Sequence, residues 1–273
     1  MRTVYLGTAQ FAAAVLRHLV AAGTAPQLVV TRPDRPAGRG RKLTAPPVAD
    51  AARELGIALA QPDDVNNASG CQLIAEAEPD ALLVCAYGAL ITEPLLSSYE
   101  ILNVHPSLLP RWRGAAPIER AIIAGDEETG VSIMRLAEGL DCGPVCAQVI
   151  EPIAADDSFG TLSERLELLS AELLNEVLAS PRQFVAQDES AATYAEKITA
   201  ADRILDTASG ATEQERVVRA LSPHIGARLE LDDGLMLGIR SAHLDGDRLV
   251  YDEVVPAGSR AMSWEEFQRG RDE

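Results

Sequence analysis

The sequence predicts an α/β protein with a Rossmann-like, mostly parallel sheet and helices on both faces, followed by a small β-barrel domain. Apolar, β-rich runs alternate with segments of helical periodicity through the first part of the chain, which is typical of repeated strand–helix–strand units. Residues 81–87 (ALLVCAY) are continuously apolar, as expected for a central parallel strand that is covered on both faces. From residue 206 onward, short alternating runs are separated by Asp, Gly and Pro, which indicates a small barrel.

The chain opens with a predicted strand, turn and helix. Thr3–Gly7 is β-rich, and Phe11, Val15, Leu16 and Leu19 then follow at helical spacing. The turn between them lacks the GxGxxG pattern, so we do not predict a dinucleotide site.

The remaining elements follow from the same two periodicities. We expect strands at residues 28–31, 57–60, 81–87, 101–104, 131–136 and 146–153 (the last at an edge), and helices at residues 47–56, 73–78, 119–124, 160–180 and 213–221. The pattern divides the chain into a first domain over residues 1–181, a linker over residues 182–205 and a C-terminal domain over residues 206–273.

Composition restricts the function classes. The 273 residues are 47% hydrophobic and carry a net charge of −17, which opposes non-specific binding of nucleic acid. No run reaches the roughly 20 apolar residues of a membrane span. The first residues lead directly into a strand pattern without a targeting segment, so we expect a cytoplasmic protein.

The cysteines do not form a recognisable metal set. Cys71 and Cys85 lie in apolar runs, and Cys142 and Cys146 are four residues apart with no Cys or His cluster beside them. We expect four free thiols and no metal.

Residues 101–118 (ILNVHPSLLPRWRGAAPI) contain the main candidate site. Pro106 ends the strand because proline lacks an N–H donor. Asn103 and His105 are two residues apart on this strand, so their side chains leave the same face. Open α/β sheets place their chemistry at such strand ends. The alternative is a buried Asn and His that only satisfy backbone groups.

This stretch resembles the signature of the 10-formyltetrahydrofolate-dependent formyltransferases, most closely the branch that formylates initiator methionyl-tRNA. The resemblance implies transfer of a formyl group from 10-formyltetrahydrofolate to the amino group of that tRNA, by a monomer and without metal. The LDCG segment implies Asp141 as a third catalytic residue, although Cys142 stands where the family often has Thr.

The expected reaction is acyl transfer through a tetrahedral oxyanion. Asn103 can donate an amide N–H to the developing oxyanion, and His105 can donate or shuttle a proton. Asp141 would orient His105 and accept the proton, directly or through water. No Ser or Cys nucleophile is required.

The resemblance also assigns the folate pocket. It implies that the donor lies along Ser107, Leu108, Leu109 and Pro110, whose open loop would leave backbone groups free for a pterin. Further contacts are expected from two residues at the end of the apolar strand, Tyr87 and Gly88. The alternative for this pair is that it merely packs the strand end.

A basic loop interrupts the acidic chain. Five cations occur within eleven residues: Arg32, Arg35, Arg39, Arg41 and Lys42. PDRPAGRGRK resembles the loop that the tRNA-formylating branch presses against the tRNA acceptor end, which implies that the last four of these cations contact RNA. The alternative is a solvated, flexible loop.

The C-terminal domain leaves the acceptor open to alternatives. The resemblance implies an OB-like barrel for tRNA, shortened here, yet residues 206–273 contain 14 acidic residues against 8 arginines, a net charge of −6. A formyltransferase acting on a small amine, such as an amino-sugar nucleotide, is the main alternative. A non-catalytic RNA-binding protein or a purine-precursor transformylase explains the motifs less well.

Overall fold

A computed structural model describes residues 1–37, 40 and 42–272. These residues form two compact units, each assembled from three segments of the chain. The first unit comprises Met1–Arg113, Gly130–Glu151 and Arg165–Thr193, and the second comprises Gly114–Thr129, Pro152–Glu164 and Tyr194–Glu273. Residues 182–193, which we predicted to belong to a linker, are therefore part of the first unit.

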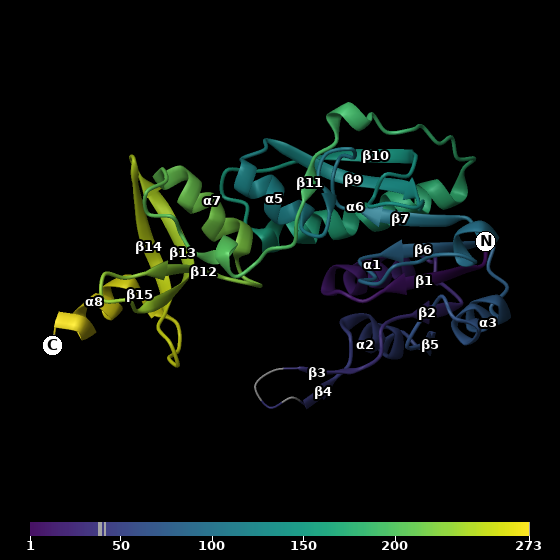
Figure 1. The fold of residues 1–273 in the computed structure, drawn as a ribbon, viewed down its shortest axis with the longest axis horizontal. Helices are drawn as coiled ribbons and strands as arrows, with labels where there is room; N and C mark the ends of the chain where they lie inside the picture. Colours follow the sequence, from purple (N-terminus) through teal and green to yellow (C-terminus); the bar gives the residue numbers. More distant parts are fainter. Residues whose placement is uncertain (38–39, 41, 273) are drawn as a thin grey trace. The chain divides into compact units, whose positions relative to one another are not determined.

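A seven-stranded sheet forms the centre of the first unit, in the order β10-β9-β7-β6-β1-β2-β5 (Figure 1). Its strands are β1 (Thr3–Gly7), β2 (Leu28–Val30), β5 (Ala58–Ala60), β6 (Ala81–Cys85), β7 (Ile101–His105), β9 (Glu128–Arg135) and β10 (Val145–Pro152). The five strands from β7 to β5 are parallel, and β9 pairs antiparallel with β7. The predicted mostly parallel sheet is thus confirmed, and β10 lies at its edge.

Strand order explains where a site can form. The chain runs outward from β1 to β2 and β5, then returns to the other side of β1 as β6 and β7. The strand order therefore reverses beside β1 and β6, where the carboxyl ends of the strands leave an open crevice in such sheets.

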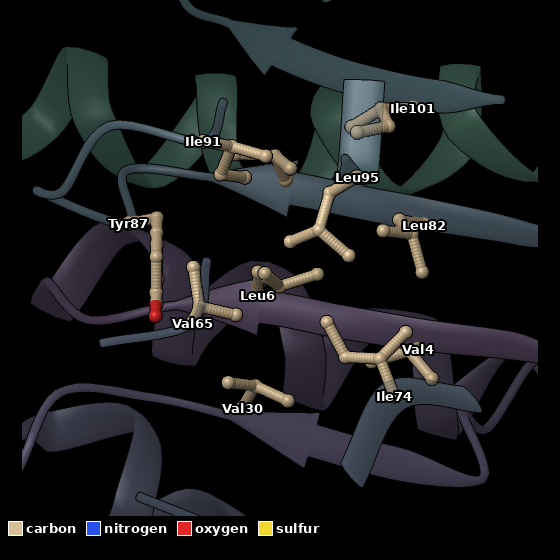
Figure 2. Close-up of a cluster of buried hydrophobic side chains, with 11 residues drawn as sticks. Val4, Leu6, Val30, Val65, Ile74, Leu82, Tyr87, Ile91, Leu95 and Ile101 are labelled. Carbon is tan, nitrogen blue, oxygen red and sulfur yellow. The ribbon is translucent and has the colours of Figure 1, made fainter. Parts of the chain in front are cut away.

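Helices cover both faces of this sheet. They are α1 (Gln10–Ala21), α2 (Pro47–Glu54), α3 (Ala68–Glu76), α4 (Leu95–Ser98) and α6 (Phe159–Ala179). On one face, Val4, Leu6 and Leu82 pack with Ile74 of α3 and Leu95 of α4 in a fully buried cluster (Figure 2).

The opposite face packs against α1. Tyr5 alternates with Val4 and Leu6, so its side chain leaves the other face of β1. It is fully buried, and its hydroxyl donates to the carbonyl oxygen of Ala12 at 2.7 Å. Burial raises the pKa of Tyr5 well above its usual value, so the phenol remains neutral.

The basic segment is more ordered than expected. The predicted irregular loop contains a β-hairpin in which β3 (Arg35–Ala37) pairs antiparallel with β4 (Lys42–Thr44). The hairpin forms a two-stranded sheet of its own, and a hairpin this short has only marginal stability in isolation. Its described side chains are exposed.

The second unit carries the antiparallel strands expected of a small barrel. Strands β12 (Ala227–Glu230), β13 (Met236–Asp245), β14 (Arg248–Val255) and β15 (Met262–Ser263) form one sheet in that order. Its helices are α5 (Pro117–Ala124), α7 (Ala211–Leu221) and α8 (Trp264–Asp272), and the short strands β8 (Arg113–Gly114) and β11 (Tyr194–Ala195) pair with each other. The predicted helix at residues 213–221 is confirmed as α7.

The core of this second unit lies between its sheet and α7. Val218 and Leu221 of α7 pack with Leu237, Ile239 and Val254 of the sheet, and all five are buried. Within the described residues of the chain, no helix is both long and apolar enough to cross a membrane.

Gly130 in β9 provides a test of sheet packing. A Cβ added there would overlap the carbonyl oxygen of Val149 in β10 and approach Leu108. Gly130→Ala should therefore lower the free energy of unfolding by about 1–3 kcal/mol, the usual range for overpacking, as measured by urea denaturation. Gly40→Ala is the control, since its Cβ would meet open space and should change stability by less than about 0.5 kcal/mol. Equal effects of the two substitutions would contradict this packing.

Candidate active site

Strand β7 carries the first two candidate residues. It lies between β6 and β9, with Asn103 opposite Met134 and His105 opposite Ser132 of β9. Both side chains leave one face of the strand, as the spacing predicts, and the residues are only 7% and 5% exposed. They are thus fixed by the sheet and not by a flexible loop.

A backbone carbonyl fixes the His105 ring. Its Nε2 lies 2.8 Å from the carbonyl oxygen of Trp112, seven residues later. A carbonyl oxygen can only accept, so Nε2 carries the hydrogen of the neutral ring and Nδ1 bears the lone pair. Trp112 adopts a φ of +61°, and the Arg111 guanidinium lies 4.4 Å from the centre of its ring.

Asp141 reaches the strand by a loop that turns back over the sheet. Because β9 is antiparallel to β7, its last residue, Arg135, lies beside Leu102 at the start of β7. The chain from there to β10 must double back to reach His105. It does so with left-handed φ values at Gly139 (+103°) and Asp141 (+46°).

The three candidate side chains meet on this face. Asn103 Nδ2 lies 3.4 Å from Asp141 Oδ1, and His105 Nδ1 lies 3.7 Å from Asp141 Oδ2. The second distance exceeds a normal hydrogen bond, so His105 and Asp141 face each other without a direct hydrogen bond at this distance. The Asp141 side chain is 15% exposed, against 6% for His105, so the carboxylate is the more accessible group.

The loop after β7 is held more tightly than expected. Ser132 Oγ donates to the Ser107 carbonyl at 2.6 Å and accepts from the Leu109 N–H at 3.0 Å, while Gln148 Nε2 donates to the Leu109 carbonyl at 2.9 Å. Leu108 and Pro110 carbonyls also accept backbone N–H groups. For the bonded groups named here, the prediction of free backbone groups in Ser107–Pro110 is therefore wrong, because buried polar groups find partners within the fold.

The two residues predicted after β6, Tyr87 and Gly88, differ in their exposure to solvent. The Tyr87 side chain is 3% exposed and belongs to the apolar cluster of Figure 2, so it packs the strand end, and this burial raises its pKa. Gly88 is exposed with a φ of +69°, and its carbonyl accepts from Arg32 Nη1 at 2.8 Å.

The basic segment is only partly described. Arg35 lies on β3 and Lys42 on β4, and both are exposed. Arg39 and Arg41 lie outside the described residues.

Four polar residues, of which Ser132 and Arg113 are buried, support the site and were not predicted. Ser132 and Gln148 fasten the loop after β7, and Arg113 and Gln187 contact the segments next to His105 and Asp141. The signal for the first pair is a polar residue within an apolar strand. For Gln187, in a segment without periodicity, the sequence holds no such signal.

The cysteines form no disulfide, and Cys142 Sγ donates to the Glu138 carbonyl within the loop of Asp141. All four cysteines are free. In the part of the chain that the structure describes, no group of three or more His, Cys, Asp or Glu side chains could hold a metal ion.

Comparison with known proteins identifies the family of the chain. Residues 1–178 match the formyl transferase family. The methionyl-tRNA formyltransferase of Halorhodospira halophila is 46% identical over 299 residues, covering 99% of this chain and 96% of that protein, and the enzyme of Methylococcus capsulatus is 44% identical over 250 residues, covering 89% and 81%.

Solved structures share the fold at lower identity. A Shewanella sugar N-formyltransferase matches with a TM-score of 0.67 and 20% identity over 90% of this chain and 99% of its own. HypX from Aquifex aeolicus in complex with tetrahydrofolic acid matches with a TM-score of 0.65 and 16% identity over 98% of this chain and 46% of its own. These two likenesses concern the fold alone, whereas the family match covers most of the sequence: the chain belongs to the formyl transferase family.

Proposed function

We propose that this protein transfers the formyl group of 10-formyltetrahydrofolate to the amino group of methionyl initiator tRNA, as a monomer in the cytoplasm. The observation that carries the proposal is 46% identity over nearly the full length of both chains to a methionyl-tRNA formyltransferase. The grouping of Asn103, His105 and Asp141 on one face supports the chemistry.

Asn103 is the proposed donor to the oxyanion. Attack of the neutral amine on the formyl carbon forms a C–N bond and places negative charge on the formyl oxygen. The Asn103 amide carries two hydrogens, of which one points to Asp141. The other can bond the developing oxyanion without a change of charge, an interaction worth about 10²–10³ in rate.

His105 and Asp141 are the proposed proton carriers. Nε2 is committed to the Trp112 carbonyl, so Nδ1 takes the proton that the attacking amine loses, with Asp141 stabilising the imidazolium. Collapse of the intermediate then breaks the bond from the formyl carbon to N10 of the folate. The proton passes to N10, which leaves tetrahydrofolate and the formylated amine.

The folate is proposed to lie against Ser107–Pro110 and the segment at Tyr87 and Gly88. Since the Leu109 N–H and the Ser107 and Leu109 carbonyls are already bonded, the proposed contribution of this segment is a rigid wall in which Leu108 and Pro110 are half-buried. Gly88 is exposed and has no side chain, so a ligand can approach its backbone closely. The fold shared with HypX, which binds tetrahydrofolic acid, agrees with a folate donor.

The basic hairpin is the proposed tRNA contact. Arg35 and Lys42 are exposed on adjacent strands, and together with Arg39 and Arg41 they concentrate positive charge in a chain of net charge −17. Such a chain needs local positive charge to bind phosphates.

A small amine is the second candidate acceptor. The net charge of −6 over residues 206–273 favours it, and the fold is shared with a sugar N-formyltransferase. The two acceptors are distinguished by incubating the protein with 10-formyltetrahydrofolate and either methionyl initiator tRNA or a UDP-amino sugar. Formylation of the sugar amine alone would contradict the tRNA proposal.

Substitutions in the triad should stop the reaction without unfolding the protein. His105→Ala and Asp141→Asn remove proton transfer and should lower kcat by about 10²–10⁴, and Asn103→Leu should lower it by about 10²–10³. His243, whose Nδ1 pairs with Asp252 at 2.8 Å on the surface, gives a matched control in His243→Ala. Wild-type kcat in any triad variant, measured with circular dichroism unchanged, would refute that residue's role.

Salt should weaken tRNA binding through the hairpin. If Arg35 and Lys42 each meet a phosphate, the double Ala variant should reduce the slope of log binding constant against log salt by about 1–2. Binding would be followed by filter retention between low and physiological salt. Arg2→Ala removes an exposed cation at the amino edge of the sheet and should leave the slope unchanged. An equal slope in the wild type and the double variant would exclude these contacts.

A further inference from the structure

The loop that carries Asp141 contains a left-handed residue and a close backbone approach. Asp141 itself has a φ of +46°, in the left-handed region that costs a non-glycine residue about 1–2 kcal/mol. At the far end of the loop a Cβ on Gly143 would overlap the Arg135 carbonyl oxygen. The close approach of Gly143 to Arg135 fixes the loop beyond Asp141, and the Leu136 N–H, which donates to the Ile101 carbonyl at 2.8 Å, fixes its start.

Gln187 provides contacts on both sides of that turn. Its Nε2 donates to the carbonyl oxygens of Asp141 at 2.8 Å and Gly143 at 2.7 Å, so both amide hydrogens are used on the loop backbone. Its Oε1 accepts from Arg113 Nε at 3.0 Å. Since the oxygen faces a cation and the nitrogen faces two carbonyls, the amide has one consistent orientation.

Arg113 fixes that orientation from a buried position. The residue is 2% exposed, and its Nη1 and Nη2 donate to the two carboxylate oxygens of Glu189 at 2.8 Å each. The guanidinium lowers the pKa of Glu189, so this pair stays ionised at neutral pH. A bidentate pair of this kind fixes the orientation of the guanidinium relative to the carboxylate.

The same segment also fixes His105. Arg113 directly follows Trp112, whose carbonyl accepts from His105 Nε2, and the Arg113 N–H donates to the Thr193 carbonyl at 2.9 Å. One short stretch of chain thus bonds the imidazole through a carbonyl and, through Arg113 and Gln187, the loop of Asp141.

We propose that Gln187 is a positioning residue that holds Asp141 against Asn103 and His105, with Arg113 and Glu189 orienting its amide. This inference rests on the proposed formyl transfer. On this proposal, the segment of the first unit that contains Gln187 and Glu189 supports the catalytic residues.

The test uses Gln187→Glu, which keeps the size and the contact with Arg113 but lacks both N–H donors. We expect kcat to fall about 10–100-fold, as for a small displacement of a catalytic group, with the KM for 10-formyltetrahydrofolate within about 3-fold. Gln187→Ala should behave alike. Gln183→Ala, at an exposed glutamine of the same segment, is the matched control and should keep wild-type kcat.

A double-mutant cycle separates positioning from general stability. In an Asp141→Asn background, Gln187→Glu should lower kcat by less than about 3-fold, because the residue that it positions no longer acts. A full 10–100-fold loss in that background, or an unchanged kcat in the single variant, would overturn the proposal.

A second readout needs no acceptor. Hydrogen–deuterium exchange in peptides covering residues 136–144 should be at least about 10-fold faster in Gln187→Glu than in wild type, and unchanged exchange would overturn the proposal. Kinetics are run with whichever amine the wild type formylates. If the wild type formylates another amine but not the tRNA, the proposed acceptor is wrong. If hydrogen–deuterium exchange is unchanged in Gln187→Glu, the proposed role of Gln187 is wrong.

Discussion

The hydrogen bond from His105 Nε2 to the Trp112 carbonyl is the constraint on which the proposed chemistry depends. It commits one ring nitrogen and turns the other, Nδ1, toward Asp141 at 3.7 Å. The partner is the backbone carbonyl of Trp112, which has a φ of +61°. Residues other than glycine rarely adopt this backbone conformation, so the surrounding fold must hold it. The ring's direction is therefore set by the chain path after β7, so any residue that fixes this path also fixes the site.

Strand β7 and the segment that contains Gln187 are distant in sequence, and together they position the three candidate side chains. The parallel sheet places Asn103 and His105 at the carboxyl end of β7, beside the point where strand order reverses. Asp141 has no such support, because its loop begins at the opposite end of β7 and doubles back. Gln187 provides contacts from outside the sheet. The acid thus depends on tertiary bonds, whereas the sheet register sets where Asn103 and His105 lie along β7.

The sequence predicted the elements whose cause is local. Apolar runs and helical spacing identified the parallel strands and most helices, and the two-residue spacing put Asn103 and His105 on one face. Helix α3 begins at Ala68, earlier than predicted, because the Asn67 side chain caps it by accepting from the Gly70 N–H. The expectation of free backbone groups in Ser107–Pro110 failed for a different reason. Their partners, such as Ser132, lie on another strand, and no local pattern reports such a bond.

The protonation of the His105 ring tests this account most directly. Nitrogen NMR of the ¹⁵N-histidine-labelled protein, with four histidines and the His105 signals assigned by comparison with a His105 substitution, reports which ring nitrogen carries the hydrogen. The account predicts that the neutral ring is protonated at Nε2 and that Nδ1 bears the lone pair. A neutral ring protonated at Nδ1 would break the bond to the Trp112 carbonyl and contradict the proposed path of the proton.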